Sequence, residues 1–148
     1  MRFLAAALVV LASATPHLTM ATSASATTVA RGSTASLFVD IVPDPKVHVY
    51  APGAKDYLPI ALELAPPSGI AAEKLKYPKA QIAVFEPLKE RVPVYDVPFR
   101  LVQDVKVSPS VKHGETLTIT GTLKYQACDD LVCFNPVSAP VRWTLKVK

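Results

Sequence analysis

Fourteen prolines are the feature that most limits what this chain can fold into. They are spread from Pro16 to Pro140, and beyond the first fifteen residues they leave no proline-free stretch with helical apolar spacing. Because proline lacks the N–H that a helix interior needs and clashes with the preceding turn, a helical bundle is excluded. Half of the 148 residues are hydrophobic and 19% are charged, so the chain can still bury a core. The sequence predicts one small domain of strands and loops.

The first residues have the pattern of a secretory signal peptide. One positive charge precedes an apolar run over residues 3–12, and a small, polar stretch ends in a small-x-small site at 24–26. The apolar run is shorter than the about 20 residues that a membrane span needs. A second small-x-small site at 12–14 would leave a leader below the usual lower limit of about 15 residues. We therefore expect a leader over residues 1–26, cleaved after Ala26, and a soluble protein that is periplasmic or otherwise outside the cytoplasm.

Charge and export limit the partners of the mature chain. The net charge of the full sequence is +4, and no run of basic residues is longer than two, so nucleic acid is not an expected partner. Residues 27–35 are small and polar and predict a flexible lead-in, followed by a domain over 36–148. Export places both cysteines in an oxidising compartment, where a disulfide forms and persists.

Apolar residues alternate with polar ones in much of the remaining chain, which is the period of half-buried strands. The clearest case is 116–124, where every odd position is apolar or Gly and every even one is Thr or Lys. The segment 141–147 repeats the pattern and is expected to close the domain with Trp143 in the core. Short strands between turn signals predict an antiparallel sandwich, with at most one helical turn at 70–76. Further strands are expected at 37–41, 47–50, 60–64, 81–85 and 97–107.

The cysteine pair is the feature that points to chemistry. The sequence has no recognisable Ser-His-Asp elbow, glycine-rich phosphate loop or His-x-x-x-His, so hydrolase, nucleotide-binding and zinc-protease functions lack a motif. Cys128 and Cys133 lie between the strands expected at 116–124 and 141–147. Four intervening residues allow the chain to bend until the two Cα atoms are about 4.4–6.8 Å apart, the separation that a disulfide needs.

Such a disulfide has two interpretations. As a structural link it contributes only about 2 kcal/mol, because the loop is short, and it joins strands that the sheet already holds together. As a redox pair in a surface loop it exchanges with a partner's thiolate through a mixed disulfide. Asp129 and Asp130 fit both, because a carboxylate raises the pKa of a neighbouring thiol and aspartate also favours turns.

The cysteine segment resembles a known family. The sequence Tyr-Gln-Ala-Cys-Asp-Asp-x-x-Cys-x-x-Pro at 125–136 closely resembles the periplasmic N-terminal domain of the DsbD family of thiol:disulfide interchange proteins. Val-His-Val-Tyr-Ala-Pro-Gly at 47–53 and Lys-Tyr-Pro at 76–78 resemble two further elements of that family. The resemblance covers residues 36–148 and implies an immunoglobulin-like β-sandwich. It also implies a cysteine pair that carries electrons from a membrane-embedded partner domain to periplasmic redox proteins.

The resemblance implies a role for each cysteine and a set of partners. Cys128 and Cys133 would cycle between dithiol and disulfide without a cofactor, and Cys128 would form the mixed disulfide with the downstream substrate. Full-length members continue into a membrane domain and a thioredoxin-like domain, whereas the sequence here ends at Lys148. We therefore expect either a separate membrane-embedded thiol reductant as donor, with thioredoxin-like or disulfide-isomerase-like exported proteins as further partners, or reuse of the domain for another task.

Other residues are expected to support the pair. The resemblance matches His48 and Tyr50 to positions that flank the cysteines, and it includes Tyr125 in the cysteine motif. It assigns the family's cap loop to residues 84–87, with Phe85 as the aromatic shield. From the residues alone, a phenylalanine at the end of a strand, such as Phe85, is more often part of the core. His48 fits a surface position because it alternates with apolar neighbours.

Two other functions stay open beside an exported thiol:disulfide oxidoreductase. An immunoglobulin-like binding module would use the disulfide only for stability, and its buried bridge would have a reduction potential below about −300 mV. Metal capture by Cys128, Cys133 and His48 would use soft thiolate ligands that suit copper(I) or zinc. Four residues separate these cysteines, however, where zinc sites usually have two.

Overall fold

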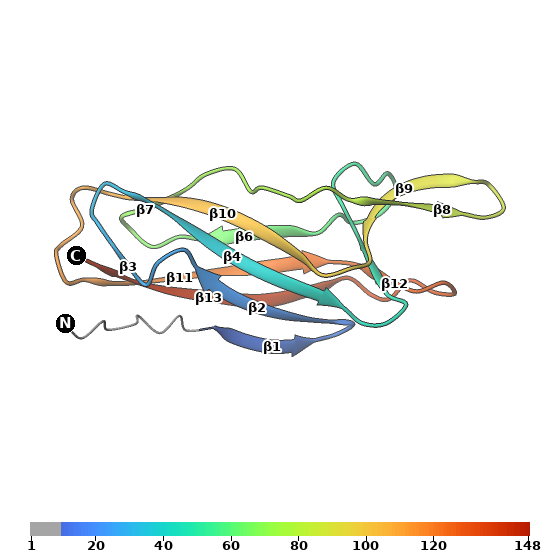
Figure 1. Cartoon of the computed structure of the whole chain (residues 1–148), viewed down its shortest axis with the longest axis horizontal. Helices are drawn as coiled ribbons and strands as arrows, with labels where there is room; N and C mark the ends of the chain where they lie inside the picture. The colour runs from blue at the N-terminus through green and yellow to red at the C-terminus, as the bar shows by residue number, and fades with distance from the viewer. Residues whose placement is uncertain (1–9) are drawn as a thin grey trace, which may run out of the picture.

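The computed structural model describes residues 10–148, which form three β-sheets (Figure 1). No helix in this range is long and apolar enough to cross a membrane. Two long sheets face each other, and a smaller sheet lies at one end of them (Figure 1). The C terminus lies at the opposite end (Figure 1).

The first sheet has the strand order β1-β2-β4-β10-β7 and is antiparallel throughout. Its central strand, β4, shows the alternation expected from the sequence, because Leu37, Val39 and Ile41 are fully buried and the residues between them are not. One face of this sheet therefore belongs to the core. The strands are β1 (Leu11–Thr15), β2 (Leu18–Ala24), β4 (Thr34–Pro43), β7 (Ile70–Ala72) and β10 (Phe99–Val107).

The second sheet has the order β3-β13-β11-β6. Strands β11 and β13 pair antiparallel along almost their whole length, and β6 lies on the other side of β11. The close approach of β6 requires a glycine at Gly121, since a Cβ there would lie 2.8 Å from the Glu63 carbonyl oxygen. The strands are β3 (Thr28–Val29), β6 (Ala61–Ala65), β11 (Thr116–Tyr125) and β13 (Val137–Val147).

The third sheet is short and carries the cysteine segment. Its order is β12-β5-β9-β8, and β12 follows β11 after a single residue. Strands β8 and β9 form a hairpin that extends beyond the two long sheets (Figure 1). The strands are β5 (His48–Tyr50), β8 (Gln81–Phe85), β9 (Glu90–Tyr95) and β12 (Ala127–Cys128).

The two long sheets enclose one apolar core. Leu37 of the first sheet and Ile119 of the second are both 0% exposed and belong to the same cluster. Burying each such side chain contributes about 1.5–3 kcal/mol. Trp143 is 3% exposed, as expected from its place in the last alternating segment, and its indole N–H donates to the Phe38 carbonyl at 3.2 Å. The expected antiparallel sandwich is therefore confirmed.

Two segments differ from the strands expected between residues 70 and 95. The helical turn allowed at 70–76 is wrong, because Ile70–Ala72 is strand β7 and the Lys76 N–H still donates to Val102 of β10 at 2.9 Å. Strand β9 was not expected, because Pro93 interrupts its sequence. Pro93 lacks an N–H for the sheet, but its carbonyl still accepts the Ala51 N–H at 3.0 Å.

The N-terminal segment is more ordered than its composition suggests. Residues 27–35, expected to be a flexible lead-in, contain β3 and the start of β4. Val29 is 5% exposed because β3 pairs with β13 at the edge of the second sheet. Residues 11–24, expected to belong to the leader, include β1 and β2 of the first sheet. Cleavage after Ala26 would remove both strands from the mature chain.

Candidate functional site

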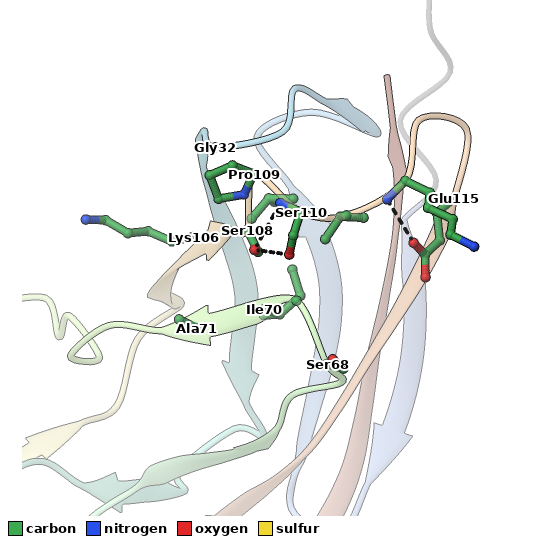
Figure 2. Close-up of a pocket in the computed structure, with 13 residues that line it drawn as sticks. Gly32, Ser68, Ile70, Ala71, Lys106, Ser108, Pro109, Ser110 and Glu115 are labelled. Carbon is green, nitrogen blue, oxygen red and sulfur yellow. Dashed lines mark hydrogen bonds between the residues drawn. The ribbon is translucent and has the colours of Figure 1, made fainter.

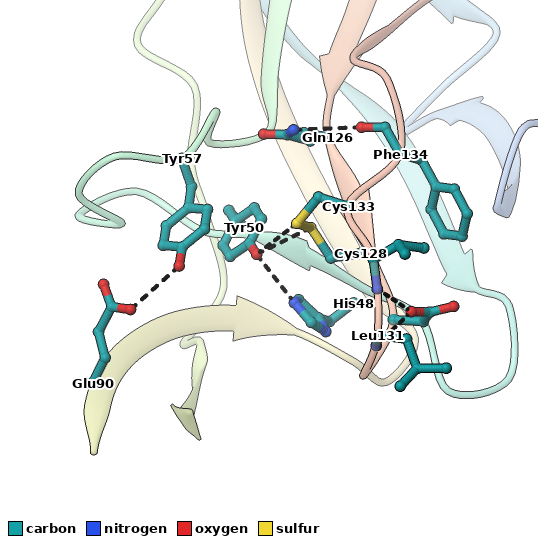
Figure 3. Close-up of a disulfide and its surroundings, with 11 residues drawn as sticks. His48, Tyr50, Tyr57, Glu90, Gln126, Cys128, Leu131, Cys133 and Phe134 are labelled. Carbon is teal, nitrogen blue, oxygen red and sulfur yellow. Dashed lines mark hydrogen bonds between the residues drawn. A yellow bond between two sulfur atoms is a disulfide. The ribbon is translucent and has the colours of Figure 1, made fainter. Parts of the chain in front are cut away.

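The two cysteines close a tight loop that begins in β12. Their Cα atoms are 4.0 Å apart and their sulfurs form a disulfide (Figure 3). Backbone bonds frame the loop, from the Asp129 N–H to the Val132 carbonyl at 3.0 Å and from the Phe134 N–H to the Ala127 carbonyl at 2.9 Å. The Asp129 carboxylate accepts the N–H groups of Val132 and Leu131, each at 2.8 Å, and these bonds lower its pKa. The Asp129 side chain therefore shapes the turn.

The two cysteines differ in their access to solvent. Cys128 is 2% exposed and pairs with β5, whereas Cys133 is exposed. The loop residues beside Cys133 are open as well, with Leu131 91% and Val132 53% exposed. Cys133 is therefore the more exposed of the two residues. The family resemblance implied that Cys128 forms the mixed disulfide, and the role of each cysteine stays a prediction.

Strand β5 directs two polar side chains toward the disulfide. Because side chains alternate along a strand, His48 and Tyr50 share one face and Val49 lies in the main core on the other. The Tyr50 hydroxyl donates a hydrogen bond to Cys128 Sγ at 3.1 Å and lies 3.6 Å from Cys133 Sγ (Figure 3). His48 Nε2 lies 3.4 Å from the same hydroxyl. Since the hydroxyl proton is directed at sulfur, the hydroxyl oxygen is the acceptor for the His48 N–H.

Aromatic rings cover this polar group. The Tyr57 ring stacks on Tyr50 with the centroids 4.2 Å apart, and the Tyr57 hydroxyl donates to Glu90 at 3.3 Å. Phe85, the last residue of β8, lies with its ring centroid 5.5 Å from that of His48. Together with the cysteine loop, the rings border an open hollow of about 150 Å³. Phe85 thus lies beside the disulfide, and its role as a shield stays a prediction.

Burial sets the protonation of the two groups on β5. Desolvation raises the pKa of Tyr50 to about 12, helped by the nearby Tyr57 and Glu90, so the hydroxyl keeps its proton at neutral pH. Desolvation also lowers the pKa of His48 below its ordinary value of 6.5, although three nearby aspartates oppose this. The imidazole is therefore neutral at pH 7, with one N–H to donate.

Tyr125 is the expected supporting residue that takes no part in this arrangement. It is fully buried, and its hydroxyl donates to the Pro16 carbonyl at 2.6 Å and bonds Thr15 Oγ1 at 2.7 Å. Tyr57, in contrast, belongs to the site but was not expected there, because the turn-rich segment 51–59 has no apolar period. The structure brings the other expected residues together around the disulfide: Cys128, Cys133, His48, Tyr50, Phe85, Asp129 and Asp130.

Metal capture gains no support from the arrangement of ligands. Within residues 10–148, no group of three or more His, Cys, Asp or Glu side chains is placed to hold a metal ion.

A larger cavity, of about 780 Å³, lies at the far end of the sandwich beside β7 and β10 (Figure 2). Neither cysteine nor histidine lines it. The Ser108 and Ser110 hydroxyls bond to each other at 2.8 Å, and the Glu115 carboxylate accepts the Lys112 N–H at 3.3 Å (Figure 2). These four polar groups are therefore bonded to one another in pairs within the cavity wall.

Known proteins resemble this chain in sequence and in fold. The family model "Thiol:disulfide interchange protein DsbD, N-terminal" matches residues 15–142. The N-terminal periplasmic domain of ScsB from Proteus mirabilis has a TM-score of 0.59 at 11% identity and covers 90% of this chain, which spans 49% of that one. The N-terminal domain of DsbD from Neisseria meningitidis, in its reduced form, has a TM-score of 0.50 at 16% identity, covering 75% of this chain and 81% of that one. No curated protein matches the sequence. The two solved structures confirm the expected immunoglobulin-like sandwich.

Proposed function

Because this chain belongs to the family of N-terminal domains of the thiol:disulfide interchange protein DsbD, we propose that it carries electrons outside the cytoplasm through Cys128 and Cys133. The oxidised pair accepts two electrons from a membrane-embedded thiol reductant. The reduced pair passes them to thioredoxin-like or disulfide-isomerase-like exported proteins. The observation that carries this proposal is an exposed Cys133 bonded to a buried Cys128, with the Tyr50 hydroxyl against both sulfurs.

Reduction of the pair proceeds by two thiol:disulfide exchanges. A partner thiolate attacks Cys133 Sγ and forms a mixed disulfide with it, which breaks the bond to Cys128 and leaves Cys128 as a thiolate. The partner's second thiolate then attacks the partner's first sulfur, which is bonded to Cys133 in the mixed disulfide. This attack releases Cys133 as a thiolate and closes the partner's disulfide. Two electrons pass to this chain, and the two protons lost by the partner's thiols are taken up by Cys128 and Cys133. No cofactor enters either step.

Tyr50 is placed to stabilise the sulfur that leaves first. Its hydroxyl already donates to Cys128 Sγ at 3.1 Å, and a pKa of about 12 keeps the hydroxyl a donor while negative charge develops on that sulfur. Hydrogen bonds to charged acceptors contribute about 1.5–3 kcal/mol. His48 donates to the hydroxyl oxygen and orients it. Tyr50 and His48 are therefore positioning residues. They affect the exchange only through the position and the charge of the Cys128 sulfur.

Phe85 controls the approach to the pair in this proposal. An open hollow of about 150 Å³ lies between the aromatic rings and the cysteine loop, and Phe85 borders it beside His48. Phe85 covers part of the approach to the pair, and a docking partner displaces its ring.

A purely structural disulfide has less support from the geometry. Cys128 and Cys133 already face each other as an antiparallel bridge, and the adjacent Phe134–Ala127 bond closes the loop without the sulfurs. The cross-link then adds only about 2 kcal/mol of loop-closure entropy.

Two serine variants test the direction of attack. Cys128→Ser leaves the exposed Cys133 thiol, and Cys133→Ser leaves the buried Cys128 thiol, while both lose the same cross-link. We expect Cys128→Ser to react with a soluble aromatic disulfide on the order of tenfold faster, and to trap a thioredoxin-like protein as a mixed disulfide. Faster reaction and trapping by Cys133→Ser would show that the attack takes place at Cys128 instead.

A further inference from the structure

Strand β2 is an integral part of the sandwich. It pairs with β4 from Leu18 to Ala24, and this pairing places β4 inside the sheet. Leu18 is 1%, Met20 5% and Thr22 6% exposed. The Thr22 hydroxyl also donates to the Arg142 carbonyl of β13 at 3.2 Å, across to the other long sheet. Without β2, the apolar face of β4 would lie at an open sheet edge, which is an aggregation hazard.

The residues just before β2 are also bound into the domain. The Pro16 carbonyl accepts the hydroxyl of the fully buried Tyr125 at 2.6 Å, and the His17 carbonyl accepts the Asp44 N–H at 3.0 Å. The His17 ring stacks on Phe134, which follows Cys133, with the centroids 3.8 Å apart. Loss of this segment would leave the Tyr125 hydroxyl buried without the partners that it has in the structure, a costly state for a polar group.

Strand β1 pairs with β2 along its whole length, but it differs from β2 in burial. Residues 11–14 are all exposed, with Leu11 at 56%. Cavities of about 280 and 400 Å³ border Leu11 between β1 and β13, so the strand is poorly packed against the domain. The boundary between dispensable and essential chain therefore falls near residue 15.

The sequence has a processing signal at that boundary. The apolar run ends at Ala12, and Ala12-Ser13-Ala14 is a small-x-small site of the kind that leader peptidases cleave. The family model also begins to match at residue 15. We propose that the leader is removed by hydrolysis of the Ala14–Thr15 peptide bond. Water supplies the atoms for a carboxylate on Ala14 and a free amino group on Thr15, so the mature domain begins at Thr15 and retains β2.

This cut lies earlier than the cleavage expected after Ala26. Both sites have the small-x-small pattern, and only the length of the leader favours the later one. The fold favours the earlier one, because the later cut removes a buried strand and the partners of Tyr125. The inference rests on export and not on redox activity.

The N terminus of the exported protein tests the proposal directly. The full chain is expressed with its own leader in a bacterial host, and the periplasmic form is analysed by intact mass and N-terminal sequencing. We expect the sequence to begin Thr15-Pro16-His17. A start at Thr27, or recovery of only the uncleaved chain, would overturn the proposal. Ala14→Leu should block processing, whereas the matched variant Ala26→Leu should be processed like the unmodified chain.

A second measurement asks whether β2 is present and folded in the exported protein. Leu18→Ala should lower its Tm by about 6–15 °C, because it leaves a cavity in the core. Thr19→Ala, at the exposed neighbouring position of the same strand, should change Tm little. An unchanged Tm in Leu18→Ala would show that β2 is absent from the exported domain. A correct start at Thr15 together with an inert disulfide would refute the proposed redox function and leave this inference intact.

Discussion

Replacing Tyr50 by phenylalanine removes a single hydroxyl from the disulfide site and leaves the aromatic ring in place. That hydroxyl donates to Cys128 Sγ at 3.1 Å, and such a bond to a charged sulfur contributes about 1.5–3 kcal/mol. At about 1.36 kcal/mol per pKa unit, its loss should raise the pKa of the Cys128 thiol by about 1–2 units. The thiol pKa is measured from thiolate absorbance in a Cys133→Ser background.

The same substitution should slow reduction of the disulfide. If roughly half of the negative charge has reached Cys128 in the transition state, about half of the hydrogen-bond energy is lost there, which slows exchange about 3- to 10-fold. The rate is followed with a reduced dithiol under pseudo-first-order conditions. Tyr57→Phe is the matched control, because it removes a hydroxyl that bonds Glu90 and touches neither sulfur. An unchanged rate in Tyr50→Phe, or equal slowing in both variants, would refute the role given to the Tyr50 hydroxyl.

Three further predictions concern the surroundings of the pair. Phe85→Ala should speed reduction of the disulfide by dithiothreitol severalfold. Val84→Ala, on the other face of β8, is the control and should not change the rate. Equal rates in the two variants would show that Phe85 does not shield the disulfide. Because burial lowers the pKa of His48, the unfolded chain binds a proton below about pH 6.5 that the folded chain does not. Stability in urea should therefore fall as the pH drops below about 6.5, and an unchanged pH dependence in His48→Gln would contradict this. Asp129→Ala should make the reduction potential less negative, since the carboxylate preorganises the oxidised turn. Asp130→Ala should leave the potential nearly unchanged. A larger change in Asp130→Ala than in Asp129→Ala would show that charge matters more than turn geometry.

Strands that have one face in the core and one in water could be predicted from the sequence. Strands β11 and β13 alternate strictly, so both their existence and the burial of Trp143 follow from the pattern. Strand β9 could not be predicted, because Pro93 breaks the pattern and the Ala51–Pro93 bond joins β9 to a segment distant in the sequence. Strand β2 also alternates, but its small and polar residues equally fit the end of a leader. The burial of Leu18 and Met20 in the sandwich distinguishes the two.

The residues of the cysteine site could be predicted from the sequence, but their arrangement could not. The spacing of Cys128 and Cys133 predicts a disulfide. The pattern around His48 places it on the face of β5 opposite Val49, but the expected surface position is wrong, because His48 is 7% exposed. Which sulfur faces solvent depends on the pairing of β12 with β5, which joins segments about eighty residues apart. The stacking of Tyr57 on Tyr50 depends in the same way on the path of an irregular turn.

The equilibrium reduction potential of the Cys128–Cys133 pair tests the proposed function most directly. The purified domain is equilibrated in redox buffers across a range of potentials, and its free thiols are counted by mass spectrometry after alkylation. An exchange protein should give a potential between about −120 and −270 mV, with the fold retained in both states. A bridge that resists reduction until the domain unfolds, or whose potential lies below about −300 mV, would contradict electron transfer and identify the disulfide as structural.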